Sequence, residues 1–113
     1  MFARWAACGM SSSCAPGRFC WISRAIAGGV PLGLALALPR EKIVLFDSDG
    51  DVQMGMGILA TIAEQQPKNF YHFMLDNECY ATTGGQPVPN AKNVAYDVIA
   101  RGAGYPRAFA FDK

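Results

Sequence analysis

The stretch that decides the fold of this 113-residue chain is KIVLFDSDGD, residues 42–51. Its first half is a short apolar run rich in strand formers, which predicts a fully buried strand of a parallel sheet. Its second half is an acidic turn in which Gly50 permits a tight bend. Asp51 is the expected N-cap of the helix that follows. The stretch therefore predicts a strand, a polar turn and a helix in succession.

Helix and strand patterns alternate on both sides of this stretch. Apolar and small residues at helical spacing predict helices over residues 25–38, 52–66 and 91–101. Apolar runs predict strands over residues 42–46, 70–75 and 108–111. This order implies right-handed crossovers between parallel strands. We therefore expect an α/β fold, a three-layer α/β/α arrangement around a mostly parallel sheet.

The composition is that of an ordinary globular protein, with 51% hydrophobic and 17% charged residues. The net charge of +1 gives no electrostatic reason to expect binding to nucleic acid or to an anionic membrane surface. The longest uncharged stretch, residues 25–39, is shorter than the about 20 residues that a membrane-spanning helix needs. We expect a cytoplasmic protein that binds neither nucleic acid nor membrane.

The first 24 residues differ in character from the rest of the chain. They show no sustained period of two or of 3.6, and they lack acidic residues. Cys8, Cys14 and Cys20 follow a spacing that fits none of the usual zinc sites, so reduced thiols are the better interpretation. We expect residues 1–24 to be an atypical segment outside the domain, and residues 25–113 to form the domain itself.

Polar residues follow both of the predicted strands that begin at residues 42 and 70. Asp49 comes after the first strand and Asn77 after the second. Ligands of open parallel sheets bind outside the carboxyl ends of the strands, so both side chains are expected at one edge. Carboxylate and amide oxygens suit Mg²⁺, and the helix that begins near Asp51 offers backbone N–H groups to a phosphate. The sequence therefore predicts a magnesium and diphosphate site.

The words around these residues resemble a known fingerprint. DSDGD at 47–51 is followed, after 28 residues from Asp49 to Asn77, by LDNECY at 75–80. This spacing resembles the Gly-Asp-Gly and Asn-Asn fingerprint of thiamine-diphosphate enzymes. LATIA at 59–63 and TGGQP at 83–87 look especially like the sulfopyruvate and phosphonopyruvate decarboxylase group. The resemblance covers residues 25–113 and implies the thiamine-diphosphate-binding fold, truncated at its N-terminal side.

The resemblance also implies roles for individual residues. Mg²⁺ would be held by the side chains of Asp49 and Asn77 and by the backbone carbonyl of Cys79. The residues expected around the thiamine diphosphate are Asp49, Gly50, Asp51, Asn77, Glu78 and Tyr80. A flap near the substrate would contain Gly84, Gly85 and Gln86. The glutamate that activates the thiazolium is expected on a separate pyrimidine-binding domain or alpha-type subunit, which implies a hetero-oligomer.

Three positions depart from the family pattern. Ser48 replaces the first glycine of Gly-Asp-Gly, which is tolerable where its φ stays negative. Asp76 replaces the first asparagine of the pair, a change that the decarboxylase group allows. Arg24 stands where an apolar residue normally supports the bent cofactor, which puts that support in doubt.

We expect the chain to be part of a carbon–carbon lyase, an enzyme that takes a small 2-oxo acid as its substrate. A first alternative is a non-catalytic truncated remnant of such an enzyme, and a second is an acetolactate-synthase-like carboligase. A third is a fragment of a haloacid-dehalogenase-type phosphatase, with Asp47 as nucleophile and Asp49 as general acid and base. An EF-hand is excluded because the glycine of DSDGD stands at position 4 rather than 6.

Overall fold

The computed structural model describes residues 13–15, 19–23 and 28–111. The elements up to the second long strand are β1 (Ser13–Ala15), β2 (Phe19–Ser23), α1 (Gly29–Ala37), β3 (Lys42–Ser48), α2 (Asp49–Met54), α3 (Ile58–Gln65) and β4 (Phe70–Leu75). They are followed by β5 (Cys79–Tyr80), β6 (Gln86–Pro87), the 3-10 helix η1 (Ala91–Asn93) and α4 (Tyr96–Gly102).

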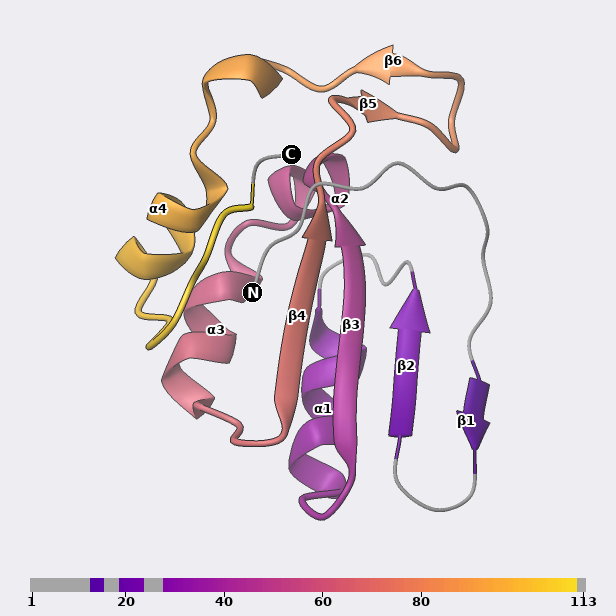
Figure 1. The fold of residues 1–113 in the computed structure, drawn as a ribbon, viewed down its shortest axis with the longest axis vertical. Coiled ribbons are helices and arrows are strands. Elements are labelled where there is room, and N and C mark those ends of the chain that lie inside the picture. The colour runs from indigo at the N-terminus through magenta and orange to yellow at the C-terminus, as the bar shows by residue number, and fades with distance from the viewer. Residues whose placement is uncertain (1–12, 16–18, 24–27, 112–113) are drawn as a thin grey trace.

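The described strands form a four-stranded sheet and a separate hairpin (Figure 1). The sheet order is β1-β2-β3-β4, in which β2, β3 and β4 are parallel and β1 is antiparallel to β2. Ile43 of β3 pairs with Cys20 on one side and with Phe70 on the other. The hairpin of β5 and β6 lies beyond the carboxyl ends of β3 and β4. The prediction of an α/β fold with a mostly parallel sheet is confirmed.

One face of this sheet carries the helices. The strands β2, β3 and β4 lie side by side in sequence order, and right-handed crossovers then place their connecting helices on the same face. Gly28, just before α1, lies against Leu45 of β3 and Ile62 of α3. On the opposite face the side chains of Phe46 and Tyr71 are 36% and 42% exposed. A second helical layer, as a three-layer arrangement would have, is not among the described residues.

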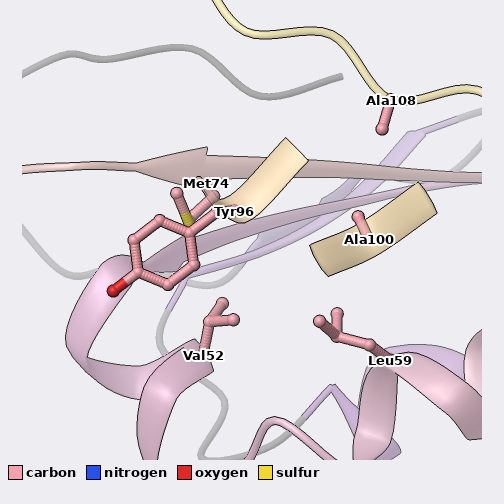
Figure 2. Packing of buried hydrophobic residues seen from close by; sticks show 6 residues of the cluster. All are labelled: Val52, Leu59, Met74, Tyr96, Ala100 and Ala108. Carbon is pink, nitrogen blue, oxygen red and sulfur yellow. The ribbon is translucent and has the colours of Figure 1, made fainter. Parts of the chain in front are cut away.

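The main core lies between β4 and the helices that follow β3 (Figure 2). Its buried members are Val52, Leu59, Met74, Tyr96, Ala100 and Ala108. A smaller cluster joins Ala35 of α1 to Ile43 of β3, with Leu34 and Phe70 packed against it. Because these buried residues come from both helices and strands, their packing sets the positions of α2 and α4 on the sheet.

Several predicted boundaries differ from the structure. The helix expected over 52–66 is two helices, because the chain turns at Gly55 and resumes at Ile58. The helix expected over 91–101 begins only at Tyr96, after the short η1. The strand expected over 108–111 is wrong, since these residues form no ladder. The guanidinium of Arg101 donates to the carbonyl of Ala108 at 3.0 Å, so a side chain takes an acceptor that a strand would offer to a neighbouring strand.

The sheet runs across the predicted domain boundary at residue 25, because β2 pairs with β3. Arg24 and Cys8 lie outside the described residues, and the expectations about them stay predictions. Cys79 is a free cysteine in the described part. No helix in the described ranges is long and apolar enough to cross a membrane.

Candidate functional site

The carboxyl ends of β3 and β4 are tied together by the side chain of Asp49. Asp49 is the first residue of α2 and follows β3 directly. One of its carboxylate oxygens, Oδ2, accepts a hydrogen bond from the backbone N–H of Glu78 at 3.0 Å. The loop after β4, which holds Asn77 and Glu78, is therefore fastened to the start of α2. The structure brings the two polar strand ends to the same edge.

Ser48 explains how α2 can start at this place. Its φ of −109° and ψ of 160° are extended, so the residue needs no glycine. Its Oγ accepts a hydrogen bond from the backbone N–H of Asp51 at 3.2 Å. Ser48 is therefore the N-cap, and the prediction that Asp51 is the N-cap is wrong, because the extended residue one turn earlier takes that place. The condition set for a serine here, a negative φ, is met.

The loop of Asn77 and Cys79 is shaped by a local hydrogen bond. The side-chain oxygen Oδ1 of Asn77 accepts from the backbone N–H of Cys79 at 3.2 Å. Cys79 pairs with Pro87 across the hairpin, and proline has no N–H with which to engage the Cys79 carbonyl. Glu78 adopts a left-handed backbone with a φ of 60°. These features turn the chain sharply at the edge of the sheet.

Gly50 is needed for space rather than for an unusual backbone angle. A Cβ atom at this position would lie 2.6 and 2.7 Å from ring carbons of Tyr80, and 3.2 Å from a methyl group of Val88. The ring of Tyr80 therefore rests directly on the backbone of α2. Val88, which the sequence analysis did not single out, is only 3% exposed, and its N–H donates to the carbonyl of Glu78 at 3.0 Å.

The expected flap forms the exposed end of the hairpin of β5 and β6. Gly84 and Gly85 have φ values of 119° and 75°, which only glycine adopts without strain. Gln86 is exposed on β6. The segment that follows β6 is held to α2, because the Gln53 side chain donates to the carbonyl of Pro89 at 3.0 Å. A role of this tip near a substrate stays a prediction.

The electrostatics of Asp49 are unusual for a carboxylate. The residue is fully buried, and its second oxygen, Oδ1, has no hydrogen-bond partner among the described residues. Burial raises the pKa of Asp49 above its ordinary value, and the neighbouring carboxylate of Asp76 raises it further. Hydrogen bonds from backbone N–H groups oppose this rise only in part. A buried anion with a free oxygen is suited to hold a cation.

Tyr96, at the start of α4, is a further residue near the site that the sequence analysis did not single out. It is 4% exposed, and its hydroxyl has no hydrogen-bond partner among the described residues. Burial raises its pKa to about 12, and the nearby carboxylate of Asp49 adds to that rise. The only signal in the sequence was a phenol placed on the apolar face of a helix, where a phenylalanine or leucine would be ordinary.

The donor set fits a hard cation such as Mg²⁺ better than a soft one. Within the described ranges, no group of three or more His, Cys, Asp and Glu side chains could hold a metal. A cation at this edge would therefore need amide and backbone oxygens in addition to the carboxylate of Asp49. All of these donors are oxygen atoms, which Mg²⁺ prefers. The fit rests on Oδ1 of Asp49, which has no hydrogen-bond partner among the described residues.

A second polar feature lies further down the same face of the sheet. His72 of β4 is buried, with its Nε2 3.5 Å from Oδ2 of Asp47. Its Nδ1 lies 3.3 Å from the hydroxyl of Tyr105. A cleft of about 760 Å³ passes beside His72 and Tyr105, with Lys68 and Arg107 in its walls. Asp47 is 4% exposed and engaged with His72, which does not favour it as a phosphatase nucleophile.

Comparison with known proteins identifies relatives of one kind. The model of the thiamine pyrophosphate enzyme C-terminal TPP binding domain matches residues 4–110. The chain is 38% identical over 82 residues to the sulfopyruvate decarboxylase subunit beta of Methanocaldococcus jannaschii, which covers 73% of this chain and 43% of the relative. It is 48% identical over 64 residues to the same subunit of Methanothermobacter thermautotrophicus, covering 57% and 34%.

A further relative is the phosphonopyruvate decarboxylase of Streptomyces viridochromogenes, which is 40% identical over 79 residues, covering 70% of this chain and 19% of the relative. The chain thus spans less than half the length of these relatives. The resemblance inferred from the DSDGD and LDNECY words is confirmed. With a parallel sheet whose polar edge carries those words, and a family match over nearly its whole length, the chain belongs to the family of thiamine pyrophosphate enzyme C-terminal TPP binding domains.

Proposed function

We propose that this chain is the thiamine-diphosphate and Mg²⁺ binding part of a 2-oxo-acid decarboxylase. The observation that carries the proposal is the fully buried carboxylate of Asp49, which uses one oxygen to fasten Glu78 and leaves the other without a hydrogen-bond partner among the described residues. A divalent cation would satisfy that oxygen and offset the cost of burying the charge. The names of the relatives, sulfopyruvate and phosphonopyruvate decarboxylase, support the reaction class.

The chain's own residues would bind and orient the cofactor. Asp49, Asn77 and the Cys79 carbonyl would hold Mg²⁺, and Gly50 would let the Tyr80 ring close over the start of α2. Gly50, Asp51, Glu78 and Tyr80 would lie around the diphosphate. The bound cofactor would supply the electron sink for loss of CO₂ from a 2-oxo acid. The roles of Gly84, Gly85 and Gln86 near that substrate belong to the same proposal.

The proposal includes a partner. The relatives named subunit beta imply that their decarboxylases have another subunit. We infer that an alpha-type subunit or pyrimidine-binding domain supplies the activating glutamate, and that the assembly is a hetero-oligomer. A further layer of helices would cover the exposed face of Phe46 and Tyr71 and complete the three layers. The free thiol of Cys79 supports a reducing, cytoplasmic location.

Thermal unfolding of the full chain tests the proposal. Mg²⁺ with thiamine diphosphate should raise the unfolding temperature of the unmutated chain, because a ligand that binds only the folded state stabilises it. The variant Asp49→Asn should abolish that rise, whereas Glu64→Gln, which removes one exposed carboxylate on α3, should keep it.

Thermal unfolding together with a product assay, both with an alpha-type partner present, distinguishes the alternatives. A rise followed by release of CO₂ from sulfopyruvate or phosphonopyruvate supports the decarboxylase. Binding with carbon–carbon bond formation instead of CO₂ release alone would support the carboligase. The absence of any ligand-dependent rise, with or without partner, would contradict the proposal and favour the non-catalytic remnant.

A further inference from the structure

Tyr96 is part of the core, but its hydroxyl has no hydrogen-bond partner among the described residues. Its ring lies in the cluster with Val52 of α2 and Met74 of β4, and the hydroxyl points away from Ala100 and Leu59 (Figure 2). The residue is 4% exposed, so bulk water does not solvate the hydroxyl freely. No described residue accepts or donates a hydrogen bond there. A buried polar atom without a partner costs free energy in the folded state.

Asp49 likewise has a buried polar atom, Oδ1, that lacks a hydrogen-bond partner among the described residues. Asp49 lies one helical turn before Val52 in α2, and Val52 shares the buried cluster with Tyr96, so the two side chains approach the same end of α2. The carboxylates of Asp49 and Asp76 add to the raised pKa of the phenol. Yet no hydrogen bond joins Asp49 and Tyr96. Two buried polar atoms, from α2 and α4, thus border the same region while neither satisfies the other.

A third group placed between them would satisfy both atoms. The carboxylate of Asp49 can bind a cation, whereas a phenol that stays protonated at neutral pH can donate to an anionic or strongly polarised oxygen. Mg²⁺ brings such oxygens with it, because it keeps several waters or phosphate oxygens in its coordination shell. The pair therefore fits an ion together with one of its oxygen ligands, rather than an ion alone.

We propose that Tyr96 is a positioning residue of this site, whose hydroxyl donates a hydrogen bond to an oxygen in the coordination shell of the cation that Asp49 holds. This inference rests on the proposed function. The oxygen belongs either to a metal-bound water or to the diphosphate. The hydroxyl gains nothing in the metal-free chain and contributes only when the ligand is present.

This role predicts that removing the hydroxyl affects the metal-free chain and ligand binding differently. The variant Tyr96→Phe keeps the ring and removes the hydroxyl, so the unfolding temperature of the metal-free chain should stay the same or rise. The affinity for the ligand should fall by roughly five- to tenfold, the effect of one hydrogen bond. A tyrosine that merely fills the core would show no change in affinity. The matched control is Tyr71→Phe, because Tyr71 lies on the exposed face of the sheet.

The experiment is a titration of the full chain followed by thermal unfolding, with Mg²⁺ alone, with Mg²⁺ and inorganic pyrophosphate, and with Mg²⁺ and thiamine diphosphate. A weaker effect of Mg²⁺ alone in Tyr96→Phe would assign the oxygen to a metal-bound water. A weaker effect only when pyrophosphate is present would assign it to the diphosphate. Either result supports the proposal when Tyr71→Phe behaves as the unmutated chain.

Other outcomes overturn it. Equal ligand affinity of the unmutated chain and Tyr96→Phe would refute the role of Tyr96 and leave the proposed function intact. A lower unfolding temperature of the metal-free variant would mean that the hydroxyl already has a partner there, which also refutes it. If the unmutated chain responds to none of the three additions, both the proposed function and the role of Tyr96 fail.

Discussion

The carboxylate of Asp49 accepts a hydrogen bond from the backbone N–H of Glu78 across 29 residues of sequence. This bond joins the start of α2 to the loop after β4, so the ends of two neighbouring strands cannot separate without breaking it. The bond engages Oδ2 with the backbone, while Oδ1 has no hydrogen-bond partner in the part of the chain that the structure describes. One side chain therefore both closes the edge of the sheet and presents a charge to it.

Replacing Asp49 by asparagine should stabilise the metal-free chain. The amide oxygen can still accept from Glu78, while the cost of a buried, partly unsatisfied anion disappears. We expect a gain of about 1 kcal/mol in the free energy of unfolding at neutral pH, measured by urea unfolding. Since the pKa of Asp49 is raised, protonation favours the folded state, and the gain should shrink as pH falls toward that pKa. A large loss of stability in D49N would contradict this account.

Ser48 should contribute to stability as a helix cap. Because its Oγ accepts from the N–H of Asp51, Ser48→Ala should cost about 1 kcal/mol. Ser48→Gly, which restores the family's glycine, should cost only a few tenths of a kcal/mol, since glycine is an acceptable N-cap. Chemical denaturation of both variants checks this order. Equal losses would show that the hydroxyl does not act as a cap.

Gly50 should tolerate no side chain while Tyr80 is present. A methyl group there would overlap the Tyr80 ring, so Gly50→Ala should cost about 1–3 kcal/mol and displace the ring. In a Tyr80→Ala background the same substitution should cost clearly less, because the ring is gone. A double-mutant cycle by urea unfolding measures this coupling. Additive effects would mean that the close approach is not the reason for the glycine.

Asn69 holds the end of α1 to the start of β4 away from the site. Its side-chain nitrogen donates to the carbonyls of Ala35, Leu38 and Glu41 at 3.0, 3.0 and 2.8 Å. Asn69→Ala should cost about 1–3 kcal/mol because carbonyls at the helix end lose their donor. Asn93→Ala, whose side chain bonds only to exposed Asn90, should cost much less. Similar losses in both variants, by thermal or urea unfolding, would argue against this role.

The phenol of Tyr96 should make the chain sensitive to alkaline pH. Its pKa is raised from 10.0 to about 12 in the folded state, mainly by burial. The titration of this phenol therefore leaves the stability of the fold unchanged below pH 10 and lowers it as pH rises from about 10 to about 12. Tyr96→Phe should remove part of that loss, and tyrosinate absorbance should show one fewer late-titrating phenol. An unchanged alkaline titration in the variant would show that another residue is responsible.

Much of the framework could be predicted from local sequence. The runs at 42–46 and 70–75 are strands in the structure, and the polar residues after them lie at one edge of a parallel sheet, as expected. The run at 108–111 looks equally strand-like but forms no ladder, because a strand requires a neighbour that the pattern cannot supply. The helix at 52–66 breaks near Gly55 for a related reason, since packing decides whether a glycine is tolerated.

The family, the strands β3 and β4 and the residue types at their ends could be read from the amino-acid sequence, because these depend on short-range patterns and on spacing along the chain. The packing of the folded chain established that Ser48 caps α2, that the Tyr80 ring rests on Gly50, and that Tyr96 shares a buried cluster with Val52 of α2. Each of these last relationships except the cap joins residues about 30 or more positions apart. Such contacts depend on how the helices pack on the sheet, which no local pattern encodes.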